Sequence, residues 1–297
     1  MKHIKPVLIL IILSVGCFCG LIAYAKENPI ASFVSLSSES ISQGDTLLIK
    51  IKKEAGISGV SGVFLKKNIG FLKDANGDWI GMAGFNPKRK IGSYKLILNF
   101  SDGTNLSKTI KANKRDFPVT KLLITQQLAD MGYSVKSIVN SSVSDTAALA
   151  RAEKYYSPIA FFSSSFAYPL KNIKSVGDFG NIRKSGSTSL QHLGVDLEAE
   201  EGTNVFASND GIVCLATELK DYGNTIVINH GLGIYTLYLH LKEFKASIAQ
   251  TVKKGDLIGI SGNTGYSIAP HLHFSLHVNG ESVDPLVFIE ETIVGMK

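Results

Sequence analysis

Short runs that alternate apolar and polar residues, or that are rich in β-branched residues, fill the chain from about residue 30 to residue 110. Thr46-Leu47-Leu48-Ile49-Lys50-Ile51 and Tyr94-Lys95-Leu96-Ile97-Leu98 are typical of β-strands. Turn residues separate such runs at Gly44-Asp45, Asn76-Gly77 and Asp102-Gly103. The pattern predicts an immunoglobulin-like β-sandwich domain over residues 27–113.

One of these turns, Asp74-Ala75-Asn76-Gly77-Asp78, begins like a calcium-binding loop. An EF-hand loop needs glycine at its sixth position and glutamate at its twelfth. Trp79 and Phe85 occupy those two places. We therefore predict a hairpin turn here rather than a calcium site.

The pattern changes over residues 114–165, which we interpret as a helical connector. One helix is expected from about Lys121 to Met131. A second is expected to begin at Ser144 or Asp145, which are good capping residues, and to continue to Tyr156.

Short strands return after Phe166, with glycines marking turns every few residues. They predict a compact antiparallel β domain over residues 166–290. The expected fold class is therefore mainly β: an N-terminal immunoglobulin-like domain, a short helical connector and a C-terminal antiparallel domain.

The chain opens with two lysines, an apolar run from Pro6 to Ile22, and the small-x-small sequence Ala23-Tyr24-Ala25. This pattern is typical of a secretory signal peptide over residues 1–25. We expect export to the periplasm or cell envelope. Because the apolar run approaches the roughly 20 residues that span a bilayer, residues 6–25 could also stay as a membrane anchor.

Composition adds three points to this picture. The 297 residues are 44% hydrophobic and 19% charged, as in a globular protein with room for two domains. The formal net charge of +6 is spread along the chain, so it does not point to nucleic acid. Cys214 is the one cysteine beyond residue 25, so the exported chain can form no internal disulfide.

The histidines gather in the C-terminal domain: of seven, all but His3 lie between His192 and His277. In the segment from His271 to Val278 every second residue is apolar, so a strand would place the histidines and Ser275 on one face. His271 and His273 would lie about 7 Å apart, close enough to share an ion, whereas His277 would lie about 13 Å from His273. We interpret His277 as a bystander.

Further candidate ligands are His192 and Asp196, which a straight strand would hold about 13 Å apart. The chain must therefore bend between them, and Gly194 permits the bend. Two imidazoles and one carboxylate leave a fourth tetrahedral position for water, as in catalytic zinc sites. Spacing alone does not decide between His271 and His273 as the third ligand. Alternation also places Thr236, Tyr238 and His240 on one strand face.

Several motifs in this domain follow one another in a characteristic order. They are His192-x-x-x-Asp196, Tyr222-Gly223-Asn224 through His230-Gly231, Tyr238-x-His240-Leu241, Gly255-Asp256-Leu257-Ile258-Gly259, Gly262-Asn263-Thr264-Gly265 and Pro270-His271-Leu272-His273-Phe274. From about Phe166 to Phe288 the sequence closely resembles the lysostaphin-like, LytM-type zinc endopeptidases, which cut peptidoglycan cross-links.

The resemblance implies a site and a mechanism. His192, Asp196 and His273 would bind zinc, and His240 and His271 would form an unligated catalytic pair. Zinc would lower the pKa of a bound water from about 15.7 toward 7 and polarise the scissile carbonyl. His271 would act as general base, and His240 would donate to the oxyanion or pass a proton to the leaving amine.

The sequence also departs from the family pattern. Ser275 stands where the family usually has glutamate, Ile268-Ala269 replaces a small residue and glycine, and Asn181-Ile182-Arg183-Lys184 is looser than the usual arginine-rich turn. These changes spare the ligands but leave substrate preference open.

Two other functions fit the same residues. One is a non-catalytic LytM-like regulator that binds the wall and activates other hydrolases, although such domains usually lack part of the ligand set. The other is a zinc protease that cuts proteins. The expected partner is peptidoglycan through its stem-peptide cross-links, and the N-terminal domain could position this substrate, bind a regulatory envelope protein or cover the cleft.

Overall fold

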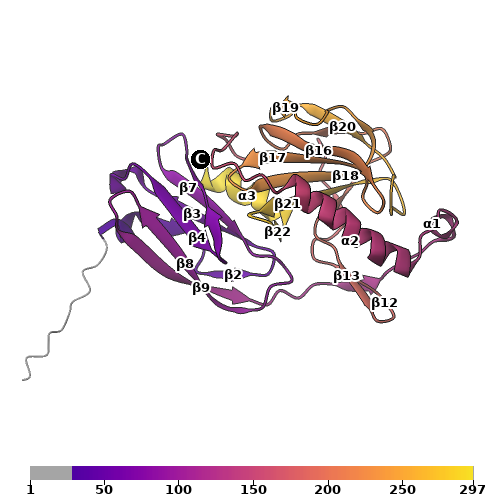
Figure 1. Cartoon of the computed structure of the whole chain (residues 1–297), viewed down its shortest axis with the longest axis horizontal. Helices are drawn as coiled ribbons and strands as arrows, with labels where there is room; N and C mark the ends of the chain where they lie inside the picture. Colours follow the sequence, from indigo (N-terminus) through magenta and orange to yellow (C-terminus); the bar gives the residue numbers. More distant parts are fainter. Residues whose placement is uncertain (1–28, 297) are drawn as a thin grey trace, which may run out of the picture.

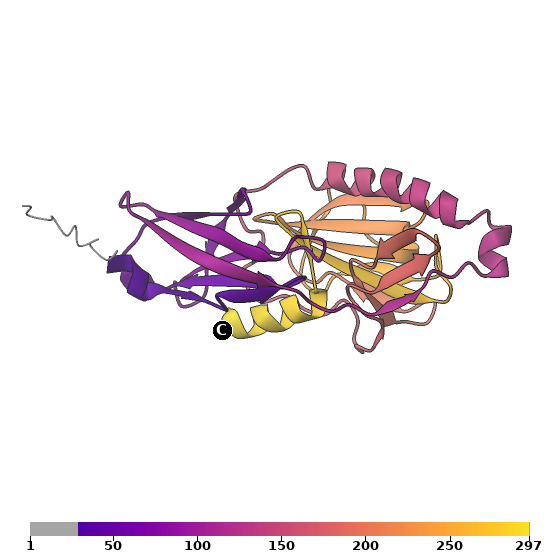
Figure 2. The ribbon, with the colours of Figure 1, turned by 90° about the horizontal axis from the view of Figure 1, so that it is seen from below.

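The computed structural model describes residues 29–296, which form two β-rich parts lying side by side (Figures 1 and 2). The mainly β fold class is confirmed. The predicted signal peptide and anchor, residues 1–25, lie outside the described residues. Across residues 29–296, no helix combines the length and apolar character needed to cross a membrane.

The N-terminal part is a sandwich of two sheets over one apolar core. The four-stranded sheet has the order β1 (Val34–Leu36), β3 (Thr46–Ile51), β7 (Trp79–Gly84) and β6 (Phe71–Lys73). The five-stranded sheet has the order β2 (Ser40–Ser42), β9 (Asn105–Asn113), β8 (Gly92–Phe100), β4 (Val60–Phe64) and β5 (Lys67–Ile69). Short 3-10 helices lie at Pro29–Phe33 and Lys53–Ala55. The sandwich agrees with the alternating pattern, and its likeness to immunoglobulin domains stays a prediction.

The turn at Asp74–Asp78 joins β6 to β7, as predicted for a hairpin. The Asp74 Oδ1 atom accepts hydrogen bonds from the N–H groups of Asn76 and Asp78, each at 2.9 Å. Lys50 forms ion pairs with Asp74 at 3.0 Å and Asp78 at 3.4 Å, and Lys52 pairs with Asp78 at 3.0 Å. Lysine ammonium groups therefore neutralise the two aspartates whose spacing resembled a calcium-binding loop.

The connector contains two helices, but their bounds differ from the prediction. The structure has β10 (Val119–Lys121), α1 (Gln126–Asp130) and α2 (Val135–Ala152). Helix α2 begins at a capping box between Ser134 and Ser137 instead of at Ser144 or Asp145. Both predicted caps lie inside the helix, where the Ser144 hydroxyl donates to a main-chain carbonyl and an Asp145 oxygen accepts the N–H of Asp221 at 2.7 Å. The predicted start was wrong because these polar side chains have tertiary and local partners.

The C-terminal part is built on an antiparallel sheet of ten strands. Its main path is β11 (Ser175–Gly177), β14 (Val195–Glu198), β21 (His271–Val278), β18 (Ile234–Phe244), β17 (Gly223–Gly231), β16 (Gly211–Leu219) and β19 (Thr251–Val252). Its branches are β15 (Asn204–Phe206), β20 (Leu257–Ser261) and β22 (Glu281–Val283). A small sheet, β10 with β12 (Ile182–Ser185) and β13 (Thr188–Gln191), ties the connector to this part.

Helix α3 (Pro285–Gly295) lies at the junction of the two parts (Figure 2) and was not predicted. Asp284 caps it, because its Oδ1 atom accepts the N–H groups of Leu286 and Val287. Pro285 occupies the first turn, where proline costs no hydrogen bond. An aspartate followed directly by proline is a helix-start signal, so the local sequence does account for this helix.

The two parts are packed against each other through apolar and charged contacts. Leu72, Ile80 and Met82 of the sandwich belong to the main apolar core of the C-terminal part. Next to them, the carboxylate of Glu281, which is 3% exposed, accepts hydrogen bonds from Lys67 and Arg89. These contacts fix the sandwich beside β22 and α3.

Candidate metal centre

Strands β14 and β21 bring the candidate ligands together. They pair antiparallel with Asp196 opposite His273 and Glu198 opposite His271. Leu272 and Phe274 alternate with the two histidines along β21 and are fully buried in the core. The histidine side chains therefore face the other side of the sheet, as the alternation predicts. The register thus places the Asp196 and His273 side chains next to each other.

His192 reaches the same point because the chain bends before β14. Residues 192–194 lie between strands β13 and β14, as predicted. Gly194 passes so near β21 that a Cβ atom on it would lie 2.4 Å from Ser275 Oγ and 2.5 Å from His273 Nε2. Glycine is therefore required here for close approach as well as for the bend.

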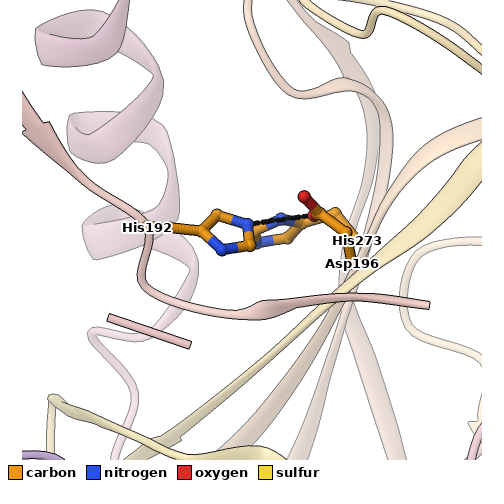
Figure 3. A group of neighbouring side chains, drawn as sticks. All are labelled: His192, Asp196 and His273. Carbon is orange, nitrogen blue, oxygen red and sulfur yellow. Dashed lines mark hydrogen bonds and ion pairs between the residues drawn. The ribbon is translucent and has the colours of Figure 1, made fainter. Parts of the chain in front are cut away.

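Three donor atoms converge on one point (Figure 3). His192 Nε2, Asp196 Oδ1 and His273 Nδ1 lie 2.9 Å from one another in each pairing. Tetrahedral zinc with bonds of about 2.0–2.1 Å holds its ligand atoms about 3.3 Å apart. The three atoms need to separate by only a few tenths of an ångström to surround such an ion.

The outward nitrogens of both candidate ligand histidines have partners that leave the inward nitrogens available. His192 Nδ1 donates to the carbonyl of Asp178 at 2.9 Å, so its Nε2 atom carries the lone pair in the neutral ring. His273 Nε2 lies 2.8 Å from the hydroxyl of Ser275, which leaves Nδ1 for a metal. Metal-binding histidines typically have such outer partners. The residues therefore fit a metal ion.

Charge and burial favour the protonation states that bind metal. Burial alone would raise the pKa of Asp196, but the adjacent rings of His192, His271 and His273 hold it below its usual range. Burial lowers the pKa of His273 to about 4. At neutral pH the site therefore presents a carboxylate and a neutral imidazole, the forms that coordinate cations.

Arg183 binds the second oxygen of Asp196, the candidate carboxylate ligand. Its Nη2 atom lies 2.9 Å from Asp196 Oδ2, while Asp196 Oδ1 faces the histidines. From the sequence, Arg183 was recognised only as part of a loose turn. Its role depends on its side chain reaching Asp196 on another strand, which no local pattern shows.

Two more histidines border the three donors. The His271 ring lies 4.9 Å from the His240 ring, and His240 lies 6.0 Å from His273, measured between ring centroids. Each Nδ1 atom bonds to a backbone carbonyl, His240 to Thr264 at 2.8 Å and His271 to Ala269 at 2.7 Å. In the neutral rings the Nε2 atoms are therefore unprotonated, and that of His271 lies 3.4 Å from Asp196 Oδ1, which would accept its proton in the charged ring.

The two rings differ in their electrostatic surroundings. Burial, together with the neighbouring His271 and His273, lowers the pKa of His240 to about 3. Burial would also lower the pKa of His271, but the hydrogen bond and charge of Asp196 raise it above its usual value. His271 is thus the better proton acceptor of the pair.

The predicted common face of Thr236, Tyr238 and His240 was wrong for His240. The Thr236 hydroxyl donates to the Tyr238 oxygen at 3.0 Å inside the core. His240 has a left-handed backbone with φ of 60°, which interrupts the alternation. Its ring consequently turns to the opposite side of the sheet, next to His271.

The remaining histidines lie outside the metal group. His277 pairs with Glu153 at 2.7 Å, in agreement with its interpretation as a bystander. His230 is fully buried and bonds to the carbonyl of Asp210 at 2.8 Å and to Thr236 at 2.7 Å. Both have structural partners.

Two imidazoles and a carboxylate converge on an antiparallel sheet, with two further histidines beside them, and this arrangement fits a catalytic metal site. Residues 190–285 match peptidase family M23. This stretch is therefore similar to peptidase family M23, as the motifs had indicated.

Named relatives agree with this assignment. The DD-carboxypeptidase/endopeptidase Mpg of Neisseria meningitidis is 41% identical over 95 residues, which are 32% of this chain and 22% of the relative. The peptidoglycan DD-endopeptidase ShyA of Vibrio cholerae has the same identity and coverage. This chain thus spans about a fifth of the length of these relatives in the matched region.

The likeness in three dimensions extends further along the chain. A solved structure from Pseudomonas aeruginosa, described as a candidate M23 peptidase, has a TM-score of 0.62 at 20% identity. The superposition covers 84% of this chain and 94% of the other. It confirms the β-rich M23 fold.

Proposed function

We propose that this protein is a zinc-dependent endopeptidase that hydrolyses peptide cross-links of peptidoglycan during cell-wall remodelling. The observation that carries the proposal is the convergence of three metal-donor atoms beside two unligated histidines. The similarity to ShyA, which is named as a peptidoglycan endopeptidase, supports the substrate class.

In this proposal His192, Asp196 and His273 hold the zinc ion. When bound, zinc supplies Lewis acidity and makes a nucleophilic water available near neutral pH.

The chain's own contribution is proton transfer. His271 accepts the proton of the attacking water at Nε2, since its Nδ1 atom is held by Ala269. His240 also presents an unprotonated Nε2 atom, so it must gain a proton before it can donate one. A shuttle between His271 and the leaving amine therefore suits His240 better than direct donation to the oxyanion from its resting state.

A non-catalytic wall-binding regulator is the less favoured alternative. A domain that has given up catalysis has no need to keep the ligands and the proton-transferring histidines in one geometry. Here His192, Asp196 and His273 converge with His240 and His271 beside them. We therefore favour the enzyme.

Metal analysis of variants tests the division of roles. We expect His192→Ala and Asp196→Ala to lose zinc because each removes a ligand. His271→Ala and His240→Ala should keep zinc while activity falls by at least about 100-fold. A zinc-free His271→Ala protein would show that His271 is a ligand and that the assignment is wrong.

Digestion of purified sacculi tests the reaction itself. The zinc-loaded protein should release muropeptides that mass spectrometry identifies as products of cross-link cleavage, and a chelator should stop the release. Casein serves as the control substrate. Cleavage of casein but not of sacculi would indicate a general protease, and binding of sacculi without cleavage would indicate a regulator.

We also propose the cell envelope as the site of action, with residues 1–25 directing export and residues 6–25 as an alternative anchor. Residues 27–113, 114–165 and 166–290 would be the sandwich, connector and peptidase units. The sandwich would present substrate, or a regulatory envelope protein, to the peptidase unit.

A further inference from the structure

The backbone of His240 depends on a neighbouring turn for its conformation. Its φ of 60° is uncommon for a residue other than glycine, and such a conformation persists only where surrounding contacts hold it. The His240 N–H donates to the carbonyl of Tyr222 at 3.0 Å, and the ring Nδ1 donates to the carbonyl of Thr264 at 2.8 Å. Tyr222 lies in the turn at residues 220–222, which joins β16 to β17.

The same turn also holds the loop that carries Thr264. The carbonyl of Asp221 accepts the N–H of Tyr266 at 2.7 Å. A Cβ atom on Gly265 would lie only 2.6 Å from the Asp221 carbonyl oxygen, so the turn and the loop pack backbone against backbone. Both hydrogen bonds of His240 therefore depend on the position of the 220–222 turn.

Helix α2 is attached to this turn by two polar side chains. The carboxylate of Asp145 accepts the N–H of Asp221 at 2.7 Å, and Ser141 Oγ lies 2.6 Å from Asp221 Oδ1. Ser141, Asp145 and Asp221 are 6%, 3% and 4% exposed. Because these contacts are buried, water cannot easily replace them, and the position of α2 fixes that of the turn.

The contacts of Ser141 indicate that Asp221 carries a proton. Ser141 Oγ lies 2.6 Å from the carbonyl oxygen of Ser137 as well as 2.6 Å from Asp221 Oδ1. A hydroxyl donates only one hydrogen, so both contacts are hydrogen bonds only if Asp221 is protonated and donates to Ser141. Asp221 Oδ2 is buried without a hydrogen-bond partner among residues 29–296, which costs less for a neutral carboxyl than for a carboxylate.

The charges around Asp221 favour the same protonated form. Burial raises the pKa of Asp221 to about 6, and the charge of Asp145 acts in the same direction. Lys220 opposes them, but it is exposed and, within the part of the chain that the structure describes, forms no ion pair with Asp221. The titratable groups that face Asp221 are Asp145 on α2, Lys220 and Tyr222 on its own turn, Tyr133 ahead of α2 and Tyr266 on the facing loop.

We propose that α2 positions His240 through the 220–222 turn, and that this contact requires a proton on Asp221. With the proton in place, Ser141 and Asp145 hold the turn, and the turn holds His240 beside His271. When Asp221 ionises, repulsion from Asp145 loosens the turn, and His240 loses the support of its backbone conformation.

Ser141, Asp145 and Asp221 are positioning residues in this proposal, because they act on the reaction through His240. The proposal rests on the proposed function, which gives His240 its part in proton transfer.

Kinetics at pH 5.5 test the positioning role. Asp145→Ala removes the acceptor of the Asp221 N–H. We expect kcat on a soluble cross-linked muropeptide dimer to fall about tenfold, a part of the roughly 100-fold cost of a 1 Å misplacement, with KM and zinc content unchanged. Asp145→Asn keeps an acceptor oxygen and should retain the wild-type kcat.

Ser142→Ala is the matched control, because the Ser142 hydroxyl donates within α2, to the carbonyl of Val139 at 2.9 Å. Equal kcat values for Asp145→Ala and Ser142→Ala would overturn the proposal. Loss of zinc from Asp145→Ala would overturn it too, since that result indicates general damage to the site.

The dependence of kcat on pH tests the proton, and it does not require that Asp145→Ala folds. Asp221→Asn replaces the carboxyl by a neutral amide that can still donate to Ser141. The ratio of its kcat to that of the wild type should be about 1 at pH 5. It should rise to about tenfold at pH 8, because wild-type Asp221 ionises near pH 6. A ratio that stays constant with pH would refute the requirement for a proton.

Nuclear magnetic resonance of the His240 ring tests the positioning without relying on hydrolysis. In the zinc-loaded full chain labelled with 15N-histidine, His240→Gln identifies the ring signals of His240. Asp145→Ala should shift these signals, and Ser142→Ala should not. The expected shifts in a protein whose wild type cleaves no dimer would support the positioning role and refute the enzyme. Unchanged His240 signals in Asp145→Ala, with an active wild type, would support the enzyme and refute the positioning role.

Discussion

Replacement of Gly194 by alanine should disable the metal site while leaving the ligands themselves unchanged. The backbone of Gly194 lies outside the left-handed region, so alanine can adopt its conformation. The added methyl group would lie 2.4 Å from Ser275 Oγ, 2.5 Å from His273 Nε2 and 2.6 Å from the Phe274 carbonyl oxygen. The whole effect must therefore come from crowding on the β21 side.

The displacement follows from these distances. Ordinary contact begins at 3.4 Å, so the nearest atoms must move by about 1 Å. Bonds between zinc and histidine tolerate only about 0.2 Å. We expect zinc affinity to fall by at least about 10- to 100-fold, as for lost outer partners of a ligand, and activity by about 100-fold. Overpacking should also cost about 1–3 kcal/mol of folding stability.

The assay is a competition titration of zinc against a chelator, combined with thermal unfolding with and without zinc. Gly59→Ala is the matched control, because its methyl group would meet only Ser101 Cβ at 3.9 Å. Zinc should raise the unfolding temperature of the wild type and of the control but should not raise that of Gly194→Ala. Normal zinc affinity and activity in Gly194→Ala would refute the idea that Gly194 sets the position of His273.

Three further outcomes are expected. Ser275→Ala should lower zinc affinity about 10- to 100-fold in the same titration, because His273 loses its outer partner. Burial, with the charge of Asp145 adding to it, raises the pKa of Asp221 from 3.8 to about 6. The stability that comes from the protonated carboxyl is fully present below the unfolded pKa and is lost as pH rises through about 6. At pH 8 the free energy of unfolding of Asp221→Asn should therefore exceed that of the wild type by at most about 3 kcal/mol. At pH 4 this difference should nearly vanish. Glu281→Gln should destabilise the packed parts by about 2 kcal/mol, whereas Glu39→Gln, in an exposed pair, should have no measurable effect in thermal unfolding.

The elements that sequence predicted well are those whose side chains follow a local period. Thr46–Ile51 is a strand with the predicted bounds, and the segment from His271 to Val278 has the predicted apolar and imidazole faces. The start of α2 was wrong because Asp145, a plausible cap, instead accepts a hydrogen bond from Asp221, far away in sequence. Local propensity could not reveal that partner.

In the candidate site, too, local spacing was predictable and contacts between distant strands were not. Spacing gave the bend at Gly194 and left His271 and His273 as equal candidates for the third ligand; the resemblance favoured His273. In the structure, the register between β14 and β21 places His273 opposite Asp196. A register between distant strands is set by tertiary packing, so sequence spacing could not have supplied it. His240 was found as a residue but given the wrong face, because its left-handed backbone breaks the strand period.

The outer contacts of the ligands explain how the departures from the family pattern bear on chemistry. A carboxylate behind a ligand histidine makes the imidazole a stronger donor to the metal, but His273 is backed here by the neutral hydroxyl of Ser275. Asp196 shares its second oxygen with the cationic Arg183, which draws electron density away from the metal side. Both contacts weaken donation to the ion, so the site should bind zinc less tightly than one with an outer carboxylate. The same weaker donation leaves the ion a stronger Lewis acid toward a scissile carbonyl, because less of its charge is neutralised by the ligands.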